Sequence, residues 1–156
     1  MKLLLDSHVL LWAAADDQRL SADARRLIQN PDNPRYFSAA SLWQITLKRG
    51  LGRADFQADP RLLRRGLLNN GYAELPVTSE HAIAVGDLPA IHKDPFDRLL
   101  LAQARIEGAI LLTADDQLRR YGDPVQVIAQ FPIIFLRRNS DMRHQGDGVD
   151  LPDPIC

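Results

Sequence analysis

Apolar positions along the chain fall into short runs that alternate with longer stretches of helical period. The short runs are rich in strand-forming residues and predict β-strands at residues 2–5, 35–39, 72–77, 109–113 and 125–128. The longer stretches predict helices at residues 8–14, 21–29, 38–50, 59–71, 78–88, 94–108 and 114–122. Short strands that alternate with helices are typical of a parallel sheet covered on both faces. We therefore expect the α/β class, as a three-layer α/β/α domain whose parallel sheet has about five short strands.

The regular pattern stops near residue 130, which sets the expected domain boundary. Residues 1–130 are predicted to form the folded domain, and residues 131–156 a C-terminal extension or tail that ends rich in Gly, Pro and Asp. The apolar run FPIIFL at 131–136 is compatible with an extra strand or with a plain extension. The single cysteine, Cys156, cannot form an internal disulfide and suits the reducing cytoplasm.

With 156 residues, 46% hydrophobic and 25% charged, the chain has the size and composition of one ordinary globular domain. Its apolar runs are too short to cross a bilayer, so we expect no membrane partner. A net charge of −1 argues against a protein that binds nucleic acid by backbone charge alone. The same net charge is compatible with an enzyme whose metal ions supply positive charge locally. The basic pairs at 25–26, 48–49, 64–65 and 137–138 are predicted to be solvated, or to flank an RNA path.

Three aspartates are expected at one edge of the predicted sheet. Asp6 directly follows the first strand, Asp115 lies two residues beyond the fourth, and Asp97 lies in the first turn of the helix before it. In open α/β sheets, ligands bind at the carboxyl ends of the strands. Clustered carboxylates repel one another, and a divalent cation that prefers oxygen ligands, Mg²⁺ or Mn²⁺, relieves the repulsion. Such ions commonly serve phosphate chemistry by activating a water nucleophile.

Each of these carboxylates also has an ordinary explanation as a helix cap. Asp94, with Pro95 behind it, is sufficiently explained by helix initiation. For Asp97, metal binding and a favourable contact with the helix dipole are equally good explanations. One of Asp115 and Asp116 is expected to act only as a cap. Capping explains the positions one by one, but it does not explain why they gather at one edge.

Other polar and aromatic residues near these positions have competing interpretations. Ser7 is predicted either to cap the first helix or to hold the Asp6 carboxylate or a water. Trp43, on an apolar helix face, is expected in the core. Arg98 is expected to form an exposed salt bridge, with a substrate phosphate as the alternative. His92 is expected to be a loop residue. The histidines are scattered along the chain, and their spacing does not predict a zinc site.

Five segments of the chain carry motifs of one family: LLLDSHVLLW, SAASLWQITLKRGLGR, LPVTSEHA, HKDPFDRLLLAQA and LLTADDQLRRYG. In this order and spacing, over about residues 1–128, the chain resembles PIN-domain proteins, specifically the VapC-type toxins of type II toxin–antitoxin pairs. The resemblance implies an endoribonuclease in which acidic residues bind one or two Mg²⁺ or Mn²⁺ ions and RNA is hydrolysed. It also implies a cognate antitoxin that blocks the cleft, and a homodimer.

The resemblance assigns site residues position by position. The first family aspartate falls on Asp6, the helix aspartate on Asp97 and the aspartate after the fourth strand on Asp115. These three are therefore expected to hold the metal. Asp94 matches a second aspartate that is frequent in the branch with the DPFDR motif. Asp94 and Asp116 are second choices, as extra ligands or as neighbours of the ligands.

One position departs from the family pattern. The family generally has a glutamate where this chain has Gln44, and Ser7 replaces the more usual threonine. An amide keeps a carbonyl oxygen but carries no negative charge and cannot act as a general base. We therefore expect Gln44 to orient a water without taking its proton, and a second metal ion to bind more weakly. A weaker nuclease, a one-metal nuclease and a silent copy are all compatible with this change.

Two alternatives to an active nuclease are open at this point. The first is a catalytically weakened or silent PIN scaffold that binds antitoxin or RNA, and Gln44 is its best support. The second is a phosphotransferase with Asp6 as its nucleophile, although such enzymes normally have a second aspartate where this chain has His8. A receiver-type signalling domain is disfavoured, because no lysine follows a late strand at a suitable place.

Overall fold

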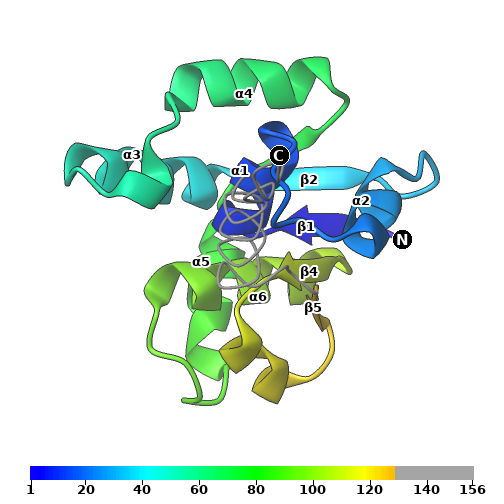
Figure 1. Ribbon diagram of the computed structural model, residues 1–156. Coiled ribbons are helices and arrows are strands. Elements are labelled where there is room, and N and C mark those ends of the chain that lie inside the picture. Colours follow the sequence, from blue (N-terminus) through cyan, green and yellow to red (C-terminus); the bar gives the residue numbers. More distant parts are fainter. Residues whose placement is uncertain (129–156) are drawn as a thin grey trace, which may run out of the picture.

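Five parallel strands form the central sheet of the computed structural model, which describes residues 1–128 (Figure 1). Their order across the sheet is β3-β2-β1-β4-β5, and every neighbouring pair is parallel. The strands are β1 (Leu3–Leu5), β2 (Arg35–Ser38), β3 (Ala73–Leu75), β4 (Ile110–Thr113) and β5 (Val125–Val127). The predicted three-layer α/β/α fold with a parallel sheet of short strands is confirmed.

Helices connect the strands, and most of them coincide with predicted helices. They are α1 (Ser7–Ala14), α2 (Ala22–Gln29), α3 (Ala39–Gly50), α4 (Pro60–Asn69), α5 (Ser79–Ala84) and α6 (Pro95–Glu107), with short 3-10 helices η1 (Ala54–Phe56), η2 (Val85–Asp87) and η3 (Asp116–Tyr121). The helix predicted at 78–88 divides into α5 and η2, and the helix predicted at 114–122 is the 3-10 helix η3. The pattern does not predict η1, which buries Phe56.

Two hydrophobic cores lie on opposite faces of the sheet. Successive residues of a strand point to opposite faces. Leu3 and Leu5 therefore join the core beneath α1 to α4, while Leu4 joins the core beneath α6. Figure 1 shows α3 and α4 on one side of the sheet and α5 and α6 on the other. All three leucines are fully buried, which explains why β1 is a uniformly apolar run without alternation.

Side-chain caps begin several of the helices, including the cap predicted at Asp94. The side chains of Ser21, Asp59 and Asp94 each accept a hydrogen bond from backbone N–H groups in the first turn of the following helix. Pro95 occupies the first position of α6, where a missing N–H costs nothing. Gly108 ends α6 with a φ of 65°, in the left-handed region that glycine adopts without strain. Local signals thus determine where these helices begin and end.

The strand order creates a switch point between β1 and β4. From β1 the chain proceeds to β2 and β3 on one side of the sheet, and it then continues with β4 and β5 on the other side. Asp6 follows β1 and Asp115 lies two residues after β4, so these two residues flank the switch point. Such a point is where open α/β sheets form their ligand crevice.

A buried polar link holds α6 against the sheet. Gln103 is completely buried, and its Oε1 accepts a hydrogen bond of 2.6 Å from the hydroxyl of Ser38 at the end of β2. Its Nε2 donates to the carbonyl of Pro76, just after β3, at 3.3 Å. The link orients the helix that carries Asp97 at its first turn.

Several predictions concern residues that the structure does not describe. The expected tail at 131–156, with the apolar run at 131–136, the basic pair at 137–138 and Cys156, lies outside the described residues, and so the boundary near residue 130 stays a prediction. Within residues 1–128, no helix has both the length and the apolar character needed to cross a membrane.

Replacing Gln103 with leucine is expected to lower the free energy of unfolding by about 1–3 kcal/mol, because the Ser38 hydroxyl and the Pro76 carbonyl lose a buried partner. Urea unfolding followed by circular dichroism measures the change. The same substitution at Gln126, which is exposed on the edge strand β5, is the matched control and should change stability by no more than about 0.5 kcal/mol. Equal unfolding midpoints for the two variants would show that the link contributes nothing.

Candidate active site

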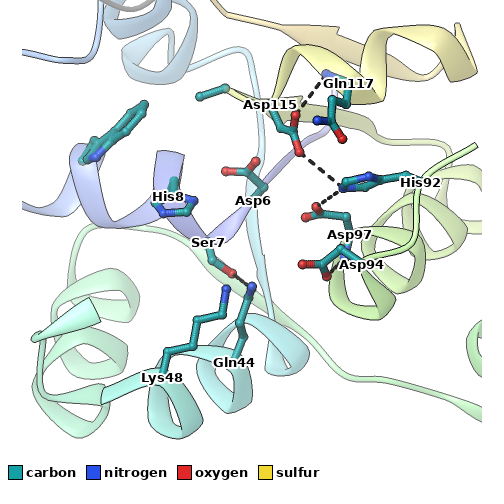
Figure 2. A pocket seen from close by; sticks show the side chains of 12 residues that line it. Asp6, Ser7, His8, Gln44, Lys48, His92, Asp94, Asp97, Asp115 and Gln117 are labelled. Atoms are coloured by element: carbon teal, nitrogen blue, oxygen red, sulfur yellow. Dashed lines mark hydrogen bonds and ion pairs between the residues drawn. The ribbon is translucent and has the colours of Figure 1, made fainter. Parts of the chain in front are cut away.

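A cavity of about 460 Å³ opens at the carboxyl end of the sheet, beside the switch point (Figure 2). Three of its lining residues are the aspartates expected to converge, Asp6, Asp97 and Asp115. The remaining lining residues are Ser7, His8, Trp12, Gln44, Lys48, His92, Asp94, Ala114 and Gln117. Residues from the end of β1, from α1 and α3, from α6 and the loop before it, and from the segment after β4 therefore meet in one place, as the sequence pattern predicts for the acidic group.

Asp6 is held by two hydrogen bonds at the start of α1. Its Oδ1 accepts the backbone N–H of Val9 at 2.9 Å, and its Oδ2 accepts the hydroxyl of Thr113 at the end of β4. Asp6 is thus the N-cap of α1, which contradicts the cap role, one of the two roles expected for Ser7. Burial raises the pKa of the Asp6 carboxyl, and these two hydrogen bonds oppose that rise. The carboxylate is oriented by bonds from two elements that are far apart in sequence.

Ser7 contacts Gln44 instead of Asp6. Its hydroxyl donates a hydrogen bond of 2.5 Å to Oε1 of Gln44, and both side chains are buried. The contact joins the first residue of α1 to the middle of α3. Gln44 lies in the lining of the cavity, and its carbonyl oxygen accepts the hydrogen bond from Ser7.

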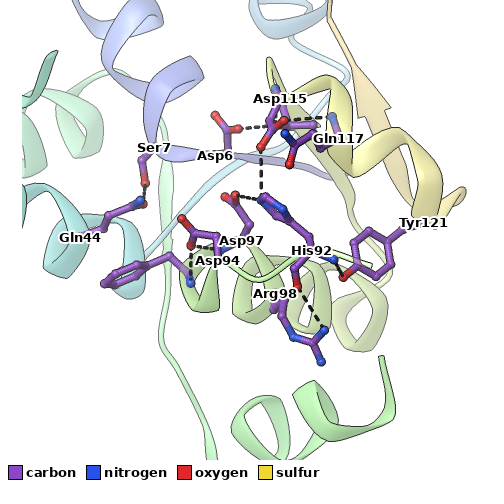
Figure 3. Close-up of polar contacts among 12 residues, drawn as sticks. Asp6, Ser7, Gln44, His92, Asp94, Asp97, Arg98, Asp115, Gln117 and Tyr121 are labelled. Atoms are coloured by element: carbon purple, nitrogen blue, oxygen red, sulfur yellow. Dashed lines mark hydrogen bonds and ion pairs between the residues drawn. The ribbon is translucent and has the colours of Figure 1, made fainter. Parts of the chain in front are cut away.

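The imidazole of His92 lies between two of the expected carboxylates (Figure 3). Its Nε2 is 2.9 Å from Oδ2 of Asp97 and 3.3 Å from Oδ2 of Asp115. The donor atoms of these three residues lie within 4.8 Å of one another. The sequence pattern predicts His92 only as a loop residue. His92 does lie in a loop, but its ring belongs to the site. The only local feature that could have indicated this role is its position two residues before the N-cap of α6.

Two side chains anchor the loop that carries His92. The hydroxyl of Tyr121 accepts the backbone N–H of His92 at 3.0 Å and donates to the carbonyl of Pro89 at 3.2 Å. The guanidinium of Arg98 donates to the carbonyls of Pro89 at 3.1 Å, Val85 at 3.0 Å and His92 at 3.4 Å. Arg98 therefore binds backbone carbonyls, which contradicts the exposed salt bridge expected from sequence.

The remaining acidic candidates differ in how they are used. Asp94 caps α6 through Oδ1 and also lines the cavity. Asp115 caps η3 through Oδ1, which accepts the N–H of Gln117 at 3.0 Å, while its Oδ2 faces the imidazole. Asp116 has a side chain that is 81% exposed and pairs with Arg119 at 2.9 Å, and it does not line the cavity. The structure thus brings Asp94 to the site and leaves Asp116 on the surface.

The environment of Asp97 is unfavourable for a negative charge. Burial, and next the charge of Asp94, raise its pKa to about 6, with a smaller contribution from Asp6. The hydrogen bond from His92 opposes the rise. A divalent cation would remove this penalty, and the oxygens of Asp97 and Asp115 with the nitrogen of His92 form a chemically suitable donor set. The carboxylate of Asp6 faces the same cavity but lies outside that group of three.

A lysine and an aromatic pair lie at the edges of the site. Lys48, one helical turn after Gln44 on α3, lines the cavity. Among the basic pairs within residues 1–128, it is the member that the fold brings there. Trp43 is 59% exposed, which contradicts the prediction of a core residue. Its ring packs edge-to-face against Phe96, with 5.2 Å between the ring centroids. Phe96 directly precedes Asp97 in α6.

Comparisons with known proteins agree on one family. The PIN domain model matches residues 3–124. Ribonuclease VapC22 of Mycobacterium tuberculosis is 32% identical over 123 residues, which cover 78% of this chain and 93% of that protein. The fold is similar to VapBC2 from Rickettsia felis bound to a DNA fragment from its promoter, with a TM-score of 0.61, 13% identity, and coverage of 84% of this chain and 100% of that chain. VapBC-1 from nontypeable Haemophilus influenzae gives a TM-score of 0.57, 18% identity, and coverage of 81% and 98%.

Replacing Asp97 with asparagine is expected to stabilise the metal-free protein at pH 7–8 by about 1–3 kcal/mol. The folded state binds the Asp97 proton more tightly than the unfolded state, so the contribution of Asp97 to stability is complete below about pH 4 and is lost as the pH rises through about 6. Asparagine cannot ionise and escapes this loss. Urea unfolding between pH 4 and 8, in the presence of EDTA, measures the difference between the variant and the wild type.

The control for this prediction is Asp23→Asn, which changes the same charge at an exposed position of α2. It should leave stability within about 0.5 kcal/mol of the wild type at every pH. A gain for Asp97→Asn that does not grow between pH 4 and pH 7 would show that the ionised carboxylate carries no folding penalty.

Proposed function

The chain belongs to the PIN-domain family, and on this premise we propose that it is a metal-dependent endoribonuclease, the toxin component of a type II toxin–antitoxin pair. The observation that carries the proposal is the meeting of Asp6, Asp97 and Asp115 at one cavity beside the switch point of the sheet. The 32% identity to a protein named as a ribonuclease supports the same activity. Membership of this family also removes the reason for a phosphotransferase that uses Asp6 as its nucleophile.

The three aspartates would hold Mg²⁺ or Mn²⁺. Carboxylate oxygens are the preferred ligands of both ions. Burial, and next the charge of Asp94, raise the pKa of Asp97, and a bound cation would offset this penalty on the ionised carboxylate. The hydrogen bonds of Asp6 to Val9 and Thr113 hold its carboxylate in a fixed orientation. Asp94 supports the site from the first turn of α6, by its charge and its place in the lining. When bound, the ion supplies an activated water and neutralises charge on the scissile phosphate.

The chain's own residues then position the substrate and the attacking water. Lys48 faces the cavity from α3, and its ammonium group would bind a phosphate of the RNA backbone near the acidic residues. Gln44 would orient the water through its amide, held by the bond from Ser7, but an amide cannot take the proton. The proton therefore leaves to solvent or to a carboxylate of the site. In-line attack on the phosphodiester would cleave the RNA by hydrolysis.

We further propose that a cognate antitoxin protein binds this chain. Three solved structures of similar fold contain VapBC, and a fourth is a toxin–antitoxin complex from Klebsiella pneumoniae. Exposed apolar side chains at Trp43, Leu47 and Leu51 follow one side of α3 and its end, and such a surface suits a protein partner. The same surface would serve a homodimer. A cytoplasmic location, suggested by the single cysteine, is compatible with an RNA substrate.

A silent scaffold that binds antitoxin or RNA without cleavage is the second candidate function. The observation that favours it is Gln44, because the cavity has an amide where the family generally has a carboxylate. With one negative charge fewer, metal binding should be weaker. The two functions differ in one measurable property, which is RNA cleavage by the wild-type chain in the presence of Mn²⁺.

Purified wild-type protein, free of antitoxin, is expected to cleave single-stranded RNA with Mn²⁺ and to lose this activity in EDTA. Asp6→Asn should lower the cleavage rate by at least about 100-fold, because removing a charged ligand costs several kcal/mol of transition-state stabilisation. Gel analysis of end-labelled RNA measures the rate. Asp23→Asn, which changes an exposed aspartate, is the matched control and should cleave like the wild type. A folded wild-type protein that leaves RNA intact with Mn²⁺ would contradict the proposal.

Gln44→Glu is expected to increase cleavage at limiting Mn²⁺, because it restores a negative charge to the cavity while Ser7 can still donate its hydrogen bond. Cleavage rates over a Mn²⁺ titration measure the effect as a lower half-saturating concentration. Gln18→Glu makes the same charge change on the exposed surface and should leave the titration unchanged. Cleavage by Gln44→Glu alone, with an inactive wild type, would identify the chain as a silent scaffold.

A further inference from the structure

We propose that His92 is a direct ligand of the metal, so that the site has a mixed donor set of one imidazole nitrogen and carboxylate oxygens. The proposal rests on the proposed function in requiring a divalent cation at the acidic cavity. It goes beyond that function in adding a nitrogen ligand from the loop before α6. His92, Asp97 and Asp115 are the group whose donor atoms lie within 4.8 Å of one another.

The distances match the coordination shell of an octahedral ion. With metal–ligand bonds of about 2.1 Å at right angles, adjacent donor atoms lie about 3.0 Å apart. His92 Nε2 lies 2.9 Å from Oδ2 of Asp97 and 3.3 Å from Oδ2 of Asp115, so both pairs have the spacing of adjacent ligands. All three donor atoms lie within 4.8 Å of one another, which suits ligation of a single ion.

The imidazole is held in place by contacts that do not use its ring. The backbone N–H of His92 donates to the hydroxyl of Tyr121, and its carbonyl accepts from the guanidinium of Arg98. Tyr121 is buried, and the two side chains also share the carbonyl of Pro89. These contacts fix the loop from η3 and from α6, while Nε2 remains directed to the carboxylates (Figure 3). A ligand fixed in this way loses little freedom when an ion binds.

A nitrogen ligand changes which ion the site prefers. Imidazole favours first-row transition ions, whereas Mg²⁺ prefers carboxylate and water oxygens. Mn²⁺ accepts both kinds of donor, so the set of His92, Asp97 and Asp115 should bind Mn²⁺ better than Mg²⁺. The imidazole also adds a donor atom to a cavity in which Gln44 supplies an amide in place of a carboxylate.

The competing role for His92 is a counter-charge, in which an imidazolium pairs with the two carboxylates and is displaced when a cation binds. The two roles make opposite predictions about the metal-bound protein. A ligand leaves its nitrogen within about 2.2 Å of the ion, and a displaced counter-charge does not. A spectroscopic measurement on bound Mn²⁺ distinguishes them without reference to activity.

Pulsed electron paramagnetic resonance of Mn²⁺ bound to tag-free, full-length protein tests the proposal. The wild type is expected to show coupling to imidazole ¹⁴N, which His92→Gln should abolish. The affinity for Mn²⁺, measured by titration of the free-ion signal, should fall about 10- to 100-fold in this variant. His8→Gln is the matched control, because His8 lines the same cavity but its Nε2 lies 3.2 Å from Asp55, and this variant should retain the coupling.

A second variant, Tyr121→Phe, keeps the imidazole but removes the hydroxyl that accepts the backbone N–H of His92. It should weaken Mn²⁺ binding while the ¹⁴N coupling persists. Bound Mn²⁺ without ¹⁴N coupling in the wild type, coupling that survives His92→Gln, or a wild type that binds no Mn²⁺ would each overturn the proposal. RNA cleavage with Mn²⁺ but without ¹⁴N coupling refutes only the ligand, whereas coupling without cleavage refutes only the nuclease.

Discussion

The parallel pairing of β1 with β4 is the constraint on which the site depends. Leu3, Leu4 and Leu5 align with Ile110, Leu111 and Leu112, and the N–H of Asp6 donates to the carbonyl of Leu112 at 3.0 Å. The pairing therefore brings the residue after β1 beside the end of β4, where Thr113 holds its carboxylate. Residues more than 100 positions apart become neighbours because two short apolar strands share one register.

The rest of the site is built around that pair of strand ends. Helix α6 brings Asp94 and Asp97 to the cavity, and its buried Gln103 ties it to the ends of β2 and β3. Helix α3, which packs on the opposite face of the sheet from α6, contributes Gln44 and Lys48 to the cavity. The acidic side chains are partly withdrawn from water, so their charges cost folding free energy until a cation compensates them. Stability and binding are thus opposed at this edge of the sheet, as is common for active sites.

Compared with the glutamate that the family resemblance implies at this position, Gln44 removes one negative charge but has nearly the same shape. Glutamine and glutamate have nearly the same volume, and Ser7 can donate to an oxygen of either side chain. The contact between α1 and α3 is therefore compatible with both residues, while the negative charge of the cavity differs by one. His92 adds a donor atom on the opposite wall without adding negative charge. The electrostatics of this site thus depend on residues outside the three aspartates.

The sequence by itself determined the strands, most helices and the meeting of Asp6, Asp97 and Asp115 at one edge of the sheet. These features follow from local rules, which are apolar runs, cap residues and the edge at which parallel strands end. Only the tertiary structure decided the direction of individual side chains. In the structure the ring of His92 points into the site, and the side chain of Trp43 is exposed. Asp6 caps α1, and the side chain of Asp116 lies in solvent. The physical reason is that each of these outcomes depends on partners distant in sequence. The orientation of His92 depends on Tyr121, 29 positions away, and no local pattern specifies that contact.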